Sequence, residues 1–310
     1  MIEKNEKIIK NCAGTLGDFY ADSEIFHSTD DGIHPSRDDI ISILLDLRKI
    51  VFPGYFCGGE YNCAESYKTF AEKLLCDVCH RLSEQVKIAM RFENDGEYSE
   101  EQIDEKSDDV CRVLCSELPS IQQKLEKDVK ATFNGDPAAK NTDEIIISYP
   151  GILAIFTYRI AHVFYKENVP LIPRIMTEYA HSRTGIDINA GAEIGENFVI
   201  DHGTGIVIGE TTEIGNNVKL YQGVTLGALS TRKGQELSGV KRHPTICDNV
   251  TIYSGSTILG GKTVIGEGAI IGGNAFITQS VLPKTKVIVK PSEHIFKTDE
   301  TNVEIGLWEI

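Results

Sequence analysis

Two residues of this chain, Asp187 and His202, have side chains that could together move a proton. A neutral imidazole takes a proton from a hydroxyl group when a carboxylate holds its other nitrogen, because the carboxylate fixes the tautomer and stabilises the imidazolium ion that forms. The two residues are fifteen positions apart, so only a fold that brings such positions together can pair them. The pair predicts His202 as a catalytic base and Asp187 as its partner, although a lone loop histidine is more often an ordinary surface residue.

A six-residue repeat between Ile188 and about Val281 predicts such a fold. Its period fits neither a helix nor the twofold alternation of a β-strand, but it does fit short extended rungs separated by corners, which is a parallel β-helix. Three rungs of six residues make a coil of about eighteen residues, so Asp187 and His202 are expected on adjacent coils. The repeated aliphatic positions are Ile188, Ile194, Ile200, Ile208, Ile214, Leu220, Leu226, Ile246, Ile252, Ile258, Ile265, Ile271 and Ile277.

The repeat is interrupted, and we expect the chain to leave the coil at each interruption. The spacing widens after Ile200 and after Ile258, and a twenty-residue excursion separates Leu226 from Ile246. Excursions from a rigid scaffold are where functional side chains are usually displayed. The rungs amount to about four coils, whose flat faces and unpaired end favour a closed cyclic assembly.

Composition favours a two-domain protein that does not bind nucleic acid. The chain has 310 residues, 41% of them hydrophobic, and a formal net charge of −15. Residues 1–144 hold 17 Lys+Arg against 30 Asp+Glu, whereas residues 145–310 hold 14 against 16. An acidic surface of this kind repels phosphate backbones, which excludes nucleic acid as a partner.

The sequence favours a cytoplasmic protein without a membrane span. Met1 is followed by Ile-Glu-Lys-Asn-Glu-Lys, where a secretory signal would have a basic stretch and an apolar core. The one apolar stretch that resembles a span, Ile145 to Tyr165, contains Pro150, Arg159 and His162, so we interpret it as a buried helix.

The eight cysteines are expected to be reduced thiols, since disulfides are rare in the cytosol. Cys76 and Cys79, and likewise Cys111 and Cys115, have spacings found in zinc sites. Both pairs lie in helix-like sequence, where steps of three or four residues simply share a face, so free thiols are favoured and no metal is expected.

Helical patterns occupy residues 36–184. Ser36 opens one of them with a capping-box pattern, and Gly185 stands where a helix would stop before the first rung. We therefore expect a helical N-terminal domain at residues 1–184, a β-helix at residues 185–290 and a flexible tail at residues 291–310.

Taken together, the motifs of this chain resemble those of the serine O-acetyltransferase family, which belongs to the hexapeptide-repeat acyltransferases. The resemblance implies an all-α N-terminal domain followed by a left-handed parallel β-helix, assembled as a homotrimer or a dimer of trimers. The matching segments are Gly135-Asp-Pro-Ala138, Tyr158-Arg-Ile-Ala-His162, Ile186 to Gly195, Asp201-His-Gly-Thr-Gly205, Gln222-Gly-Val-Thr-Leu-Gly227 and Lys241-Arg-His-Pro244.

The resemblance also implies a reaction, the first step of cysteine biosynthesis. Acetyl-CoA is the acetyl donor and the L-serine hydroxyl the acceptor, giving O-acetylserine and CoA. His202 would deprotonate the hydroxyl, which attacks the thioester directly without an acyl-enzyme.

The family's substrate-binding residues correspond to four positions here. Asp136 and Asp201 would surround the substrate amine, and Arg242 would grip its carboxylate through a planar fork, with His243 assisting on the same side. Without the resemblance, Asp136 would be taken as an ordinary turn residue and Arg242 as part of a solvated basic loop.

Four further positions are implied for acetyl-CoA. The Ala228 amide, after Gly227, would stabilise the oxyanion, and such a donor is worth roughly a hundredfold in rate. The CoA arm would lie in the cleft between neighbouring subunits, near Ser254 and Gly273.

Two regulatory interactions are implied as well. In the family, a C-terminal isoleucine inserts into the active site of O-acetylserine sulfhydrylase, the next enzyme of the pathway, and Ile310 is in that position here. Cysteine would act as a feedback inhibitor at the serine site.

Three rival interpretations remain open. A related acyltransferase could use another acceptor such as a sugar, although Asp136, Asp201 and Arg242 favour an amino acid. A γ-type carbonic anhydrase would need three histidines for zinc, but residues 185–290 contain only His202 and His243. In a structural solenoid without activity, an Asp/His pair beside a coil break would have no purpose.

Overall fold

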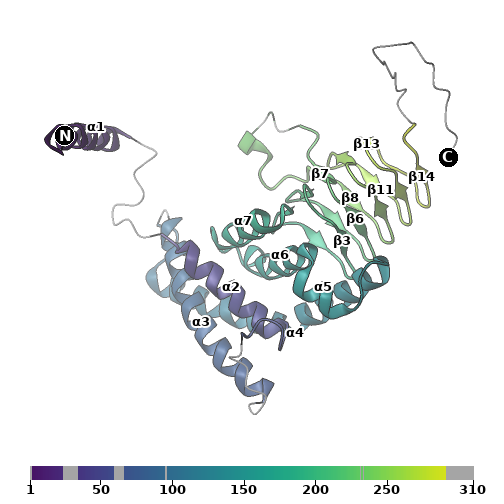
Figure 1. Cartoon of the computed structure of the whole chain (residues 1–310), viewed down its shortest axis with the longest axis horizontal. Coiled ribbons are helices and arrows are strands. Elements are labelled where there is room, and N and C mark those ends of the chain that lie inside the picture. Colours follow the sequence, from purple (N-terminus) through teal and green to yellow (C-terminus); the bar gives the residue numbers. More distant parts are fainter. Residues whose placement is uncertain are drawn as a thin grey trace, which may run out of the picture.

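The chain forms a group of helices followed by a coil of short strands (Figure 1). The computed structural model describes residues 2–23, 34–58, 66–94, 96–230, 232 and 234–290. The predicted tail at residues 291–310, including Ile310, lies outside the described residues. The helices are α1 (Ile2–Asp22), α2 (Arg37–Val51), α3 (Tyr67–Phe92), α4 (Glu100–Gly135), α5 (Thr142–Ser148), α6 (Pro150–Lys166) and α7 (Ile172–Thr184).

The helix boundaries follow from local capping. Ser36 precedes α2, and its hydroxyl accepts a hydrogen bond from the Asp39 amide at 3.2 Å, which confirms the predicted cap. A full capping box, Ser99 with Gln102, opens α4. Helix α7 ends at Gly185, whose φ of 69° is the left-handed conformation that glycine adopts most readily.

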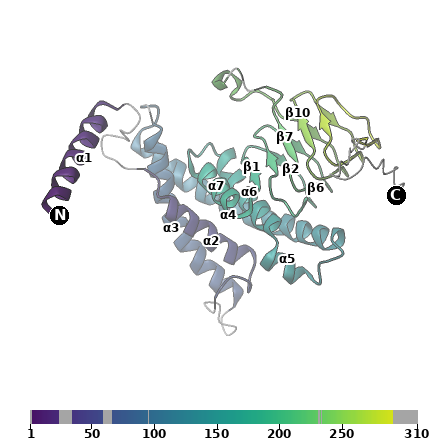
Figure 2. The same ribbon diagram turned by 45° about the horizontal axis from the view of Figure 1, so that its top comes forward.

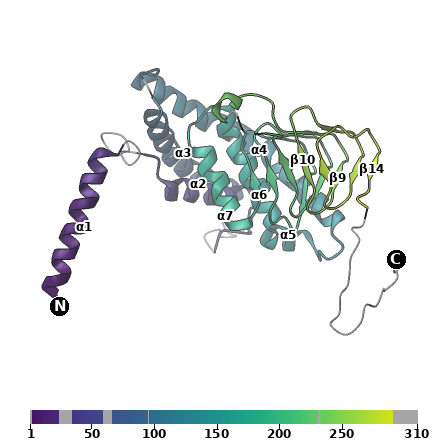
Figure 3. The same cartoon turned by 90° about the horizontal axis from the view of Figure 1, so that it is seen from above.

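Helices α4, α6 and α7 connect the helical part to the coil (Figures 2 and 3). Helix α6 is buried along most of its length and contacts β1 and β3, while α4 contacts β3. One hydrophobic core runs from these helices into the coil without a break. Helix α1 stands apart in all three views and exposes apolar side chains such as Phe19, and it was not among the helical patterns that we predicted.

Among the described residues, no single helix is long and apolar enough to cross a membrane. Helices α5 and α6 would pass such a test as a pair, by length and composition alone, but they are bent by 70° at Tyr149.

The strands form three parallel sheets, which confirms the predicted parallel β-helix. The β1 sheet has the order β1-β4-β7-β10-β13, the β2 sheet β2-β5-β8-β11, and the β3 sheet β3-β6-β9-β12-β14. Strand β14 pairs with β12 beyond the last rung that we predicted, so the coil has about five turns rather than about four. The strands are β1 (Asp187–Ile188), β2 (Glu193–Ile194), β3 (Val199–Asp201), β4 (Val207–Ile208), β5 (Glu213–Ile214), β6 (Lys219–Tyr221), β7 (Thr225–Gly227), β8 (Thr245–Ile246), β9 (Thr251–Ile252), β10 (Thr257–Leu259), β11 (Val264–Ile265), β12 (Ile270–Ile271), β13 (Phe276–Ile277) and β14 (Lys286–Val287).

The register accounts for the sixfold repeat. The repeated aliphatic residues stack inside the coil, so that Ile188 pairs with Ile208, and Ile208 with Leu226. The alternate residues point outward, and the corners between sheets carry the chain from one face to the next. The long excursion leaves the coil after β7, contains the short 3₁₀ helix η1 (Gly234–Leu237) and stands away from the strands (Figure 2).

Candidate active site

His202 lies on the corner between the β3 sheet and the β1 sheet, and its imidazole points into solvent. Its side chain is 72% exposed, and its φ of 58° is a left-handed conformation that is costly for a residue other than glycine. Gly203 follows with φ 88°, and a Cβ atom there would lie 2.5 Å from Ile186 Cδ1. Other corner residues of the coil, such as Asn217 and Asn274, have the same φ of 58°, so this conformation belongs to the corners in general.

Asp201 is the last residue of β3, and Lys219 of the neighbouring strand β6 binds it. Lys219 Nζ lies 2.9 Å from Asp201 Oδ2 and donates to the Gly135 carbonyl at 2.8 Å. Burial lowers the pKa of Lys219, but its hydrogen bonds to Asp201 and Tyr221 outweigh that effect and leave the pKa raised. The ammonium group therefore ties the end of α4 to the coil.

Asp136 caps the C-terminus of α4 and faces the same corner. Tyr149 donates a hydrogen bond to Asp136 Oδ2 at 2.6 Å, and the Ala138 amide donates to Oδ1 at 2.8 Å. The Tyr149 bond is the main reason that the pKa of Asp136 is lowered, and the nearby charges of Lys219 and His202 contribute. The structure thus brings together Asp136, Asp201 and His202, which are three of the predicted site residues.

The predicted CoA residues Ser254 and Gly273 lie further along the same corner of the coil. Successive corners are joined by backbone hydrogen bonds, including Asn274 N to Ser254 O at 2.8 Å. A Cβ atom at Gly273 would lie 3.2 Å from the Ser254 carbonyl oxygen, so the backbones of these two corners lie close together with no side chain of residue 273 between them. We call this line of corners, residues 202–205, 222–224, 254–256 and 273–275, the His202 edge.

Arg242 and His243 lie on a different line of corners, between the β1 sheet and the β2 sheet. They end the long excursion, and the Thr211 side chain binds both, accepting from the Arg242 amide at 2.9 Å and the His243 amide at 3.1 Å. Gly227 and Ala228 begin the excursion on the same side. We call this line, residues 209–212, 227–230, 241–244 and 260–263, the Arg242 edge.

Arg242 forms an ion pair with Glu210 on the Arg242 edge. The Arg242 guanidinium contacts Glu210 Oε2, and its Nη1 donates to the Leu237 carbonyl at 3.0 Å. Tyr165 donates to the other oxygen of Glu210 at 3.0 Å. Burial raises the pKa of Glu210, but the hydrogen bonds from Arg242 and Tyr165 outweigh that effect and leave the pKa lowered.

His243 is buried beneath this ion pair. Burial, and then the charge of Arg242, lowers the pKa of His243 to about 4, so the ring is neutral near pH 7. Its Nδ1 accepts a hydrogen bond from the Thr211 amide at 3.1 Å, and the ring covers Gly209, where a Cβ atom would lie 2.1 Å from it.

One rung of the β1 sheet separates the two edges within a chain. Five residue steps from Gly205 to Glu210 correspond to roughly 16 Å of extended backbone. A single subunit therefore does not bring Arg242 and His243 next to His202. Among the described residues, no hydrogen bond or ion pair joins His202 to Asp187. Asp187 is the first residue of β1, where Val207 of β4 lies beside it in the sheet. The contact between His202 and Asp187 therefore stays a prediction. The carboxylate recorded beside His202 is Asp201, with Oδ1 3.8 Å from Nε2.

Two residues of this site, Lys219 and Tyr149, were missed by the sequence analysis. They join segments far apart in the chain, and neither belongs to the segments that carry the family resemblance, so no sequence signal marked them. No group of three or more His, Cys, Asp or Glu side chains in the described part of the chain is arranged to hold a metal ion.

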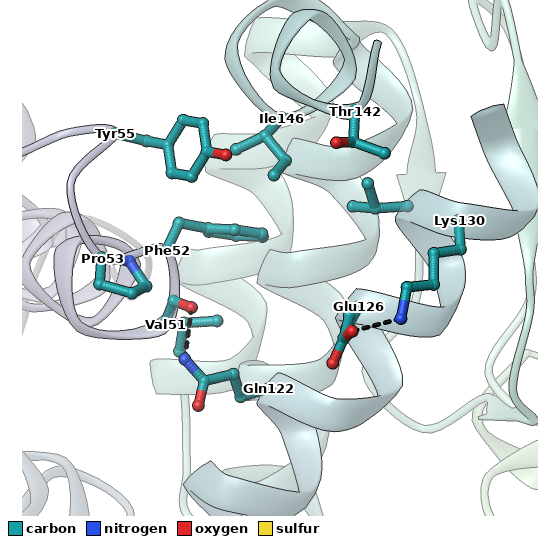
Figure 4. A pocket seen from close by; sticks show the side chains of 10 residues that line it. Val51, Phe52, Pro53, Tyr55, Gln122, Glu126, Lys130, Thr142 and Ile146 are labelled. Carbon is teal, nitrogen blue, oxygen red and sulfur yellow. Dashed lines mark hydrogen bonds and ion pairs between the residues drawn. The ribbon is translucent and has the colours of Figure 1, made fainter.

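A separate pocket lies among α2, α4 and α5 (Figure 4) and contains none of the predicted site residues. Gln122 donates to the Val51 carbonyl at 2.9 Å, and Glu126 pairs with Lys130. Because these polar groups already bind one another, we assign the chemistry to the edges of the coil.

The chain is similar in sequence to serine acetyltransferases. It is 42% identical over 228 residues to the protein named serine acetyltransferase, plasmid, of Synechococcus elongatus, which covers 71% of each chain. It is 50% identical over 131 residues to serine acetyltransferase of Bacillus licheniformis, covering 42% of this chain and 58% of that relative. No family model matches the chain.

The chain is also similar in fold to solved structures of serine acetyltransferases. Serine acetyltransferase 1 of Entamoeba histolytica, in complex with L-cysteine, superposes with a TM-score of 0.70 at 32% identity, covering 92% of this chain and 100% of that one. The Neisseria gonorrhoeae enzyme in complex with serine has a TM-score of 0.53 at 26% identity, covering 81% and 97%. A serine acetyltransferase in complex with CoA has a TM-score of 0.50 at 25% identity, covering 79% and 95%.

Proposed function

Because the chain belongs to the serine acetyltransferase family, we propose that it transfers the acetyl group of acetyl-CoA to the hydroxyl of L-serine. The products are O-acetylserine and CoA, as in the first step of cysteine biosynthesis. The observation that carries this proposal is the 42% identity to a serine acetyltransferase over 71% of the chain. Relatives solved with serine and with CoA support the choice of the two substrates.

His202 is the proposed base. Its exposed imidazole takes the proton of the serine hydroxyl, whose oxygen attacks the thioester carbon of acetyl-CoA. The tetrahedral intermediate then expels the CoA thiolate, while the Ala228 amide stabilises the oxyanion. Asp201, 3.8 Å from Nε2, and the predicted partner Asp187 both supply negative charge that stabilises the imidazolium ion.

Asp136 and Asp201 are the proposed ligands of the substrate ammonium group. The hydrogen bond from Tyr149 lowers the pKa of Asp136 and keeps it ionised at neutral pH. Lys219 already binds Asp201. The carboxylates of Asp136 and Asp201 together carry two negative charges, and the ammonium group of Lys219 neutralises only one of them. That surplus favours a second cation at the site, as an amino-acid amine provides.

A homotrimer is the proposed assembly, because the site is incomplete within one chain. Three prisms packed around a threefold axis place the His202 edge of each subunit against the Arg242 edge of its neighbour, and the interface closes after three copies. Arg242 would then grip the serine carboxylate beside the His202 of the adjacent subunit. Whether two trimers associate further through the helices stays a prediction.

Co-expression of two inactive variants tests this arrangement. A random mixture of His202→Ala and Arg242→Ala subunits should regain about one quarter of the wild-type activity, because one interface in four combines intact edges. Mixed assemblies that stay inactive would place both residues in the same subunit's site and refute the shared site.

The reaction itself is tested by thiol release from acetyl-CoA with several acceptors. We expect turnover with L-serine that greatly exceeds turnover with homoserine, threonine or simple sugars. A preference for a sugar would refute the proposed acceptor and leave only the acyltransferase class.

Cysteine is proposed to inhibit by occupying the serine site, as the L-cysteine complex of the Entamoeba relative suggests. The expected pattern is inhibition competitive with serine. The proposed contact with O-acetylserine sulfhydrylase depends on Ile310, outside the described residues. Deletion of Ile310 should abolish co-purification with that enzyme, and unchanged co-purification would refute the contact. A cytoplasmic location stays a prediction.

A further inference from the structure

Four cysteines gather where α3 packs against α4, on two helices that contain none of the proposed site residues; Asp136 follows the far end of α4. Cys76 and Cys79 lie one turn apart on α3, and Cys111 and Cys115 lie one turn apart on α4. The Sγ atoms of Cys79 and Cys115 are 3.6 Å apart, which is van der Waals contact. Two thiols that are 36 residues apart in sequence therefore touch across the helix interface.

The geometry suits a covalent bond between these two sulfur atoms. A disulfide has an S–S length of about 2.05 Å, so the two sulfurs, now 3.6 Å apart, need to approach by only about 1.5 Å. Cys115 is exposed and Cys79 is half-buried, so small oxidants reach the pair from solvent. Both are free thiols in the structure, and no metal-binding group includes them among the described residues.

We propose that Cys79 and Cys115 form a reversible disulfide between α3 and α4 when the protein meets a peroxide. The sulfur of Cys115 attacks one peroxide oxygen, the O–O bond breaks, and a sulfenic acid and one water form. The sulfur of Cys79 then attacks the sulfenic sulfur, the S–O bond breaks, and the released hydroxide takes the Cys79 proton as a second water. In total, two thiols lose two electrons and two protons, and one peroxide becomes two waters.

Cys111 is the competing partner on α4. Its Sγ donates to the Cys79 carbonyl at 3.4 Å, and the hydrogen bond from the Cys79 thiol lowers the pKa of Cys111. Although Cys115 is exposed as a residue, partial desolvation of its thiol against α3, and then the neighbouring Cys79, raise the pKa of Cys115 to about 11, which slows its reaction near neutral pH. The ground for Cys115 is the 3.6 Å contact between its sulfur and that of Cys79, and the test must separate Cys115 from Cys111.

Peptide mapping of the full-length protein shows whether Cys79 forms a disulfide with Cys115 or with Cys111. The protein is reduced, desalted, treated with hydrogen peroxide at pH 8.5, alkylated and digested with trypsin without reductant. Cleavage after Arg112 places Cys111 in peptide 107–112 and Cys115 in peptide 113–124, while Cys76 and Cys79 share peptide 74–81. A Cys76→Ser background therefore makes every crosslink to peptide 74–81 a crosslink to Cys79.

The expected product joins peptide 74–81 to peptide 113–124 and disappears on treatment with a phosphine reductant. It should be lost in Cys115→Ser and kept in the matched variant Cys111→Ser, with circular dichroism verifying that both variants fold. A crosslink to peptide 107–112 instead, oxidation of Cys115 to sulfinic or sulfonic acid without a crosslink, or no oxidation at Cys115 would each overturn the proposal.

Discussion

The strongest prediction concerns the buried ion pair that fastens the helices to the first coil. Asp128 of α4 is fully buried and accepts hydrogen bonds from Arg159 Nε at 2.9 Å and from the Phe198 amide at 2.9 Å. Arg159 of α6 also donates to the Gly195 carbonyl at 2.8 Å. Two side chains therefore join α4, α6 and the loop before β3, the strand that ends at Asp201.

The test replaces Asp128, Arg159 or both residues. Asp128→Leu leaves the Arg159 charge buried without a counter-ion, and such a loss typically costs about 3–5 kcal/mol of unfolding free energy. Arg159→Met leaves Asp128 uncompensated and should cost a similar amount. Burial raises the pKa of Asp128 even with Arg159 beside it, so the ionised pair is itself costly to bury. The double variant should therefore lose much less than the sum of the single variants.

Urea unfolding followed by circular dichroism, at one fixed protein concentration, measures these free energies. Each single variant should shift the midpoint strongly, and the cycle should give a coupling energy of about 2 kcal/mol or more between the two residues. Single variants that lose less than about 1 kcal/mol, or a double variant that loses the full sum, would refute the inference that this pair holds the two parts together.

Three further predictions address the proposed site. His202→Ala should lower turnover by roughly 10² to 10⁴ with unchanged circular dichroism, and unchanged turnover would remove His202 as the base. Arg242→Lys should raise the KM for serine about tenfold or more and leave that for acetyl-CoA unchanged, because lysine lacks the planar fork; equal changes in both constants would contradict a role specific to serine. The folded-state pKa of His243, about 4, lies below its ordinary value of 6.5, so the unfolded chain binds the proton first and stability falls as the pH drops from 6.5 toward 4, by at most about 3 kcal/mol. His243→Gln should lose less stability than the wild type across that window in urea titrations, and parallel curves would contradict the buried neutral imidazole.

Periodicity made the coil predictable, because each repeat fixes one inward residue and one corner. The pattern becomes irregular near its end, where Ile277 and Val281, the bridge partner of Ile265, are only four positions apart; Val287 of β14 then follows Val281 at the regular spacing of six. Helix α1 falls within the helical domain predicted at residues 1–184, but no separate helical pattern was identified there, although Ile8, Leu16 and Phe19 share one face at helical spacing.

The site was predictable only in part, because its contacts cross long sequence separations. The resemblance identified Asp136 and Asp201, but the lysine between them, Lys219, belongs to a rung whose outward positions follow no repeat. Counting three rungs to a coil puts His202 after a third rung, Ile200, and Arg242 between a first rung, Leu226, and a second rung, Ile246. The repeat thus assigns the two residues to different corners, and the order of strands in the three sheets agrees.

The excursion after β7 leaves no mark on the strands around it. Ile214 of β5 pairs with Ile246 of β8, and Leu226 of β7 with Ile258 of β10, as though no residues had been inserted. A segment of different length could therefore occupy this place without shifting the register of the coil, provided that it keeps the contacts of Arg242 with Glu210 and of His243 with Gly209 at its base.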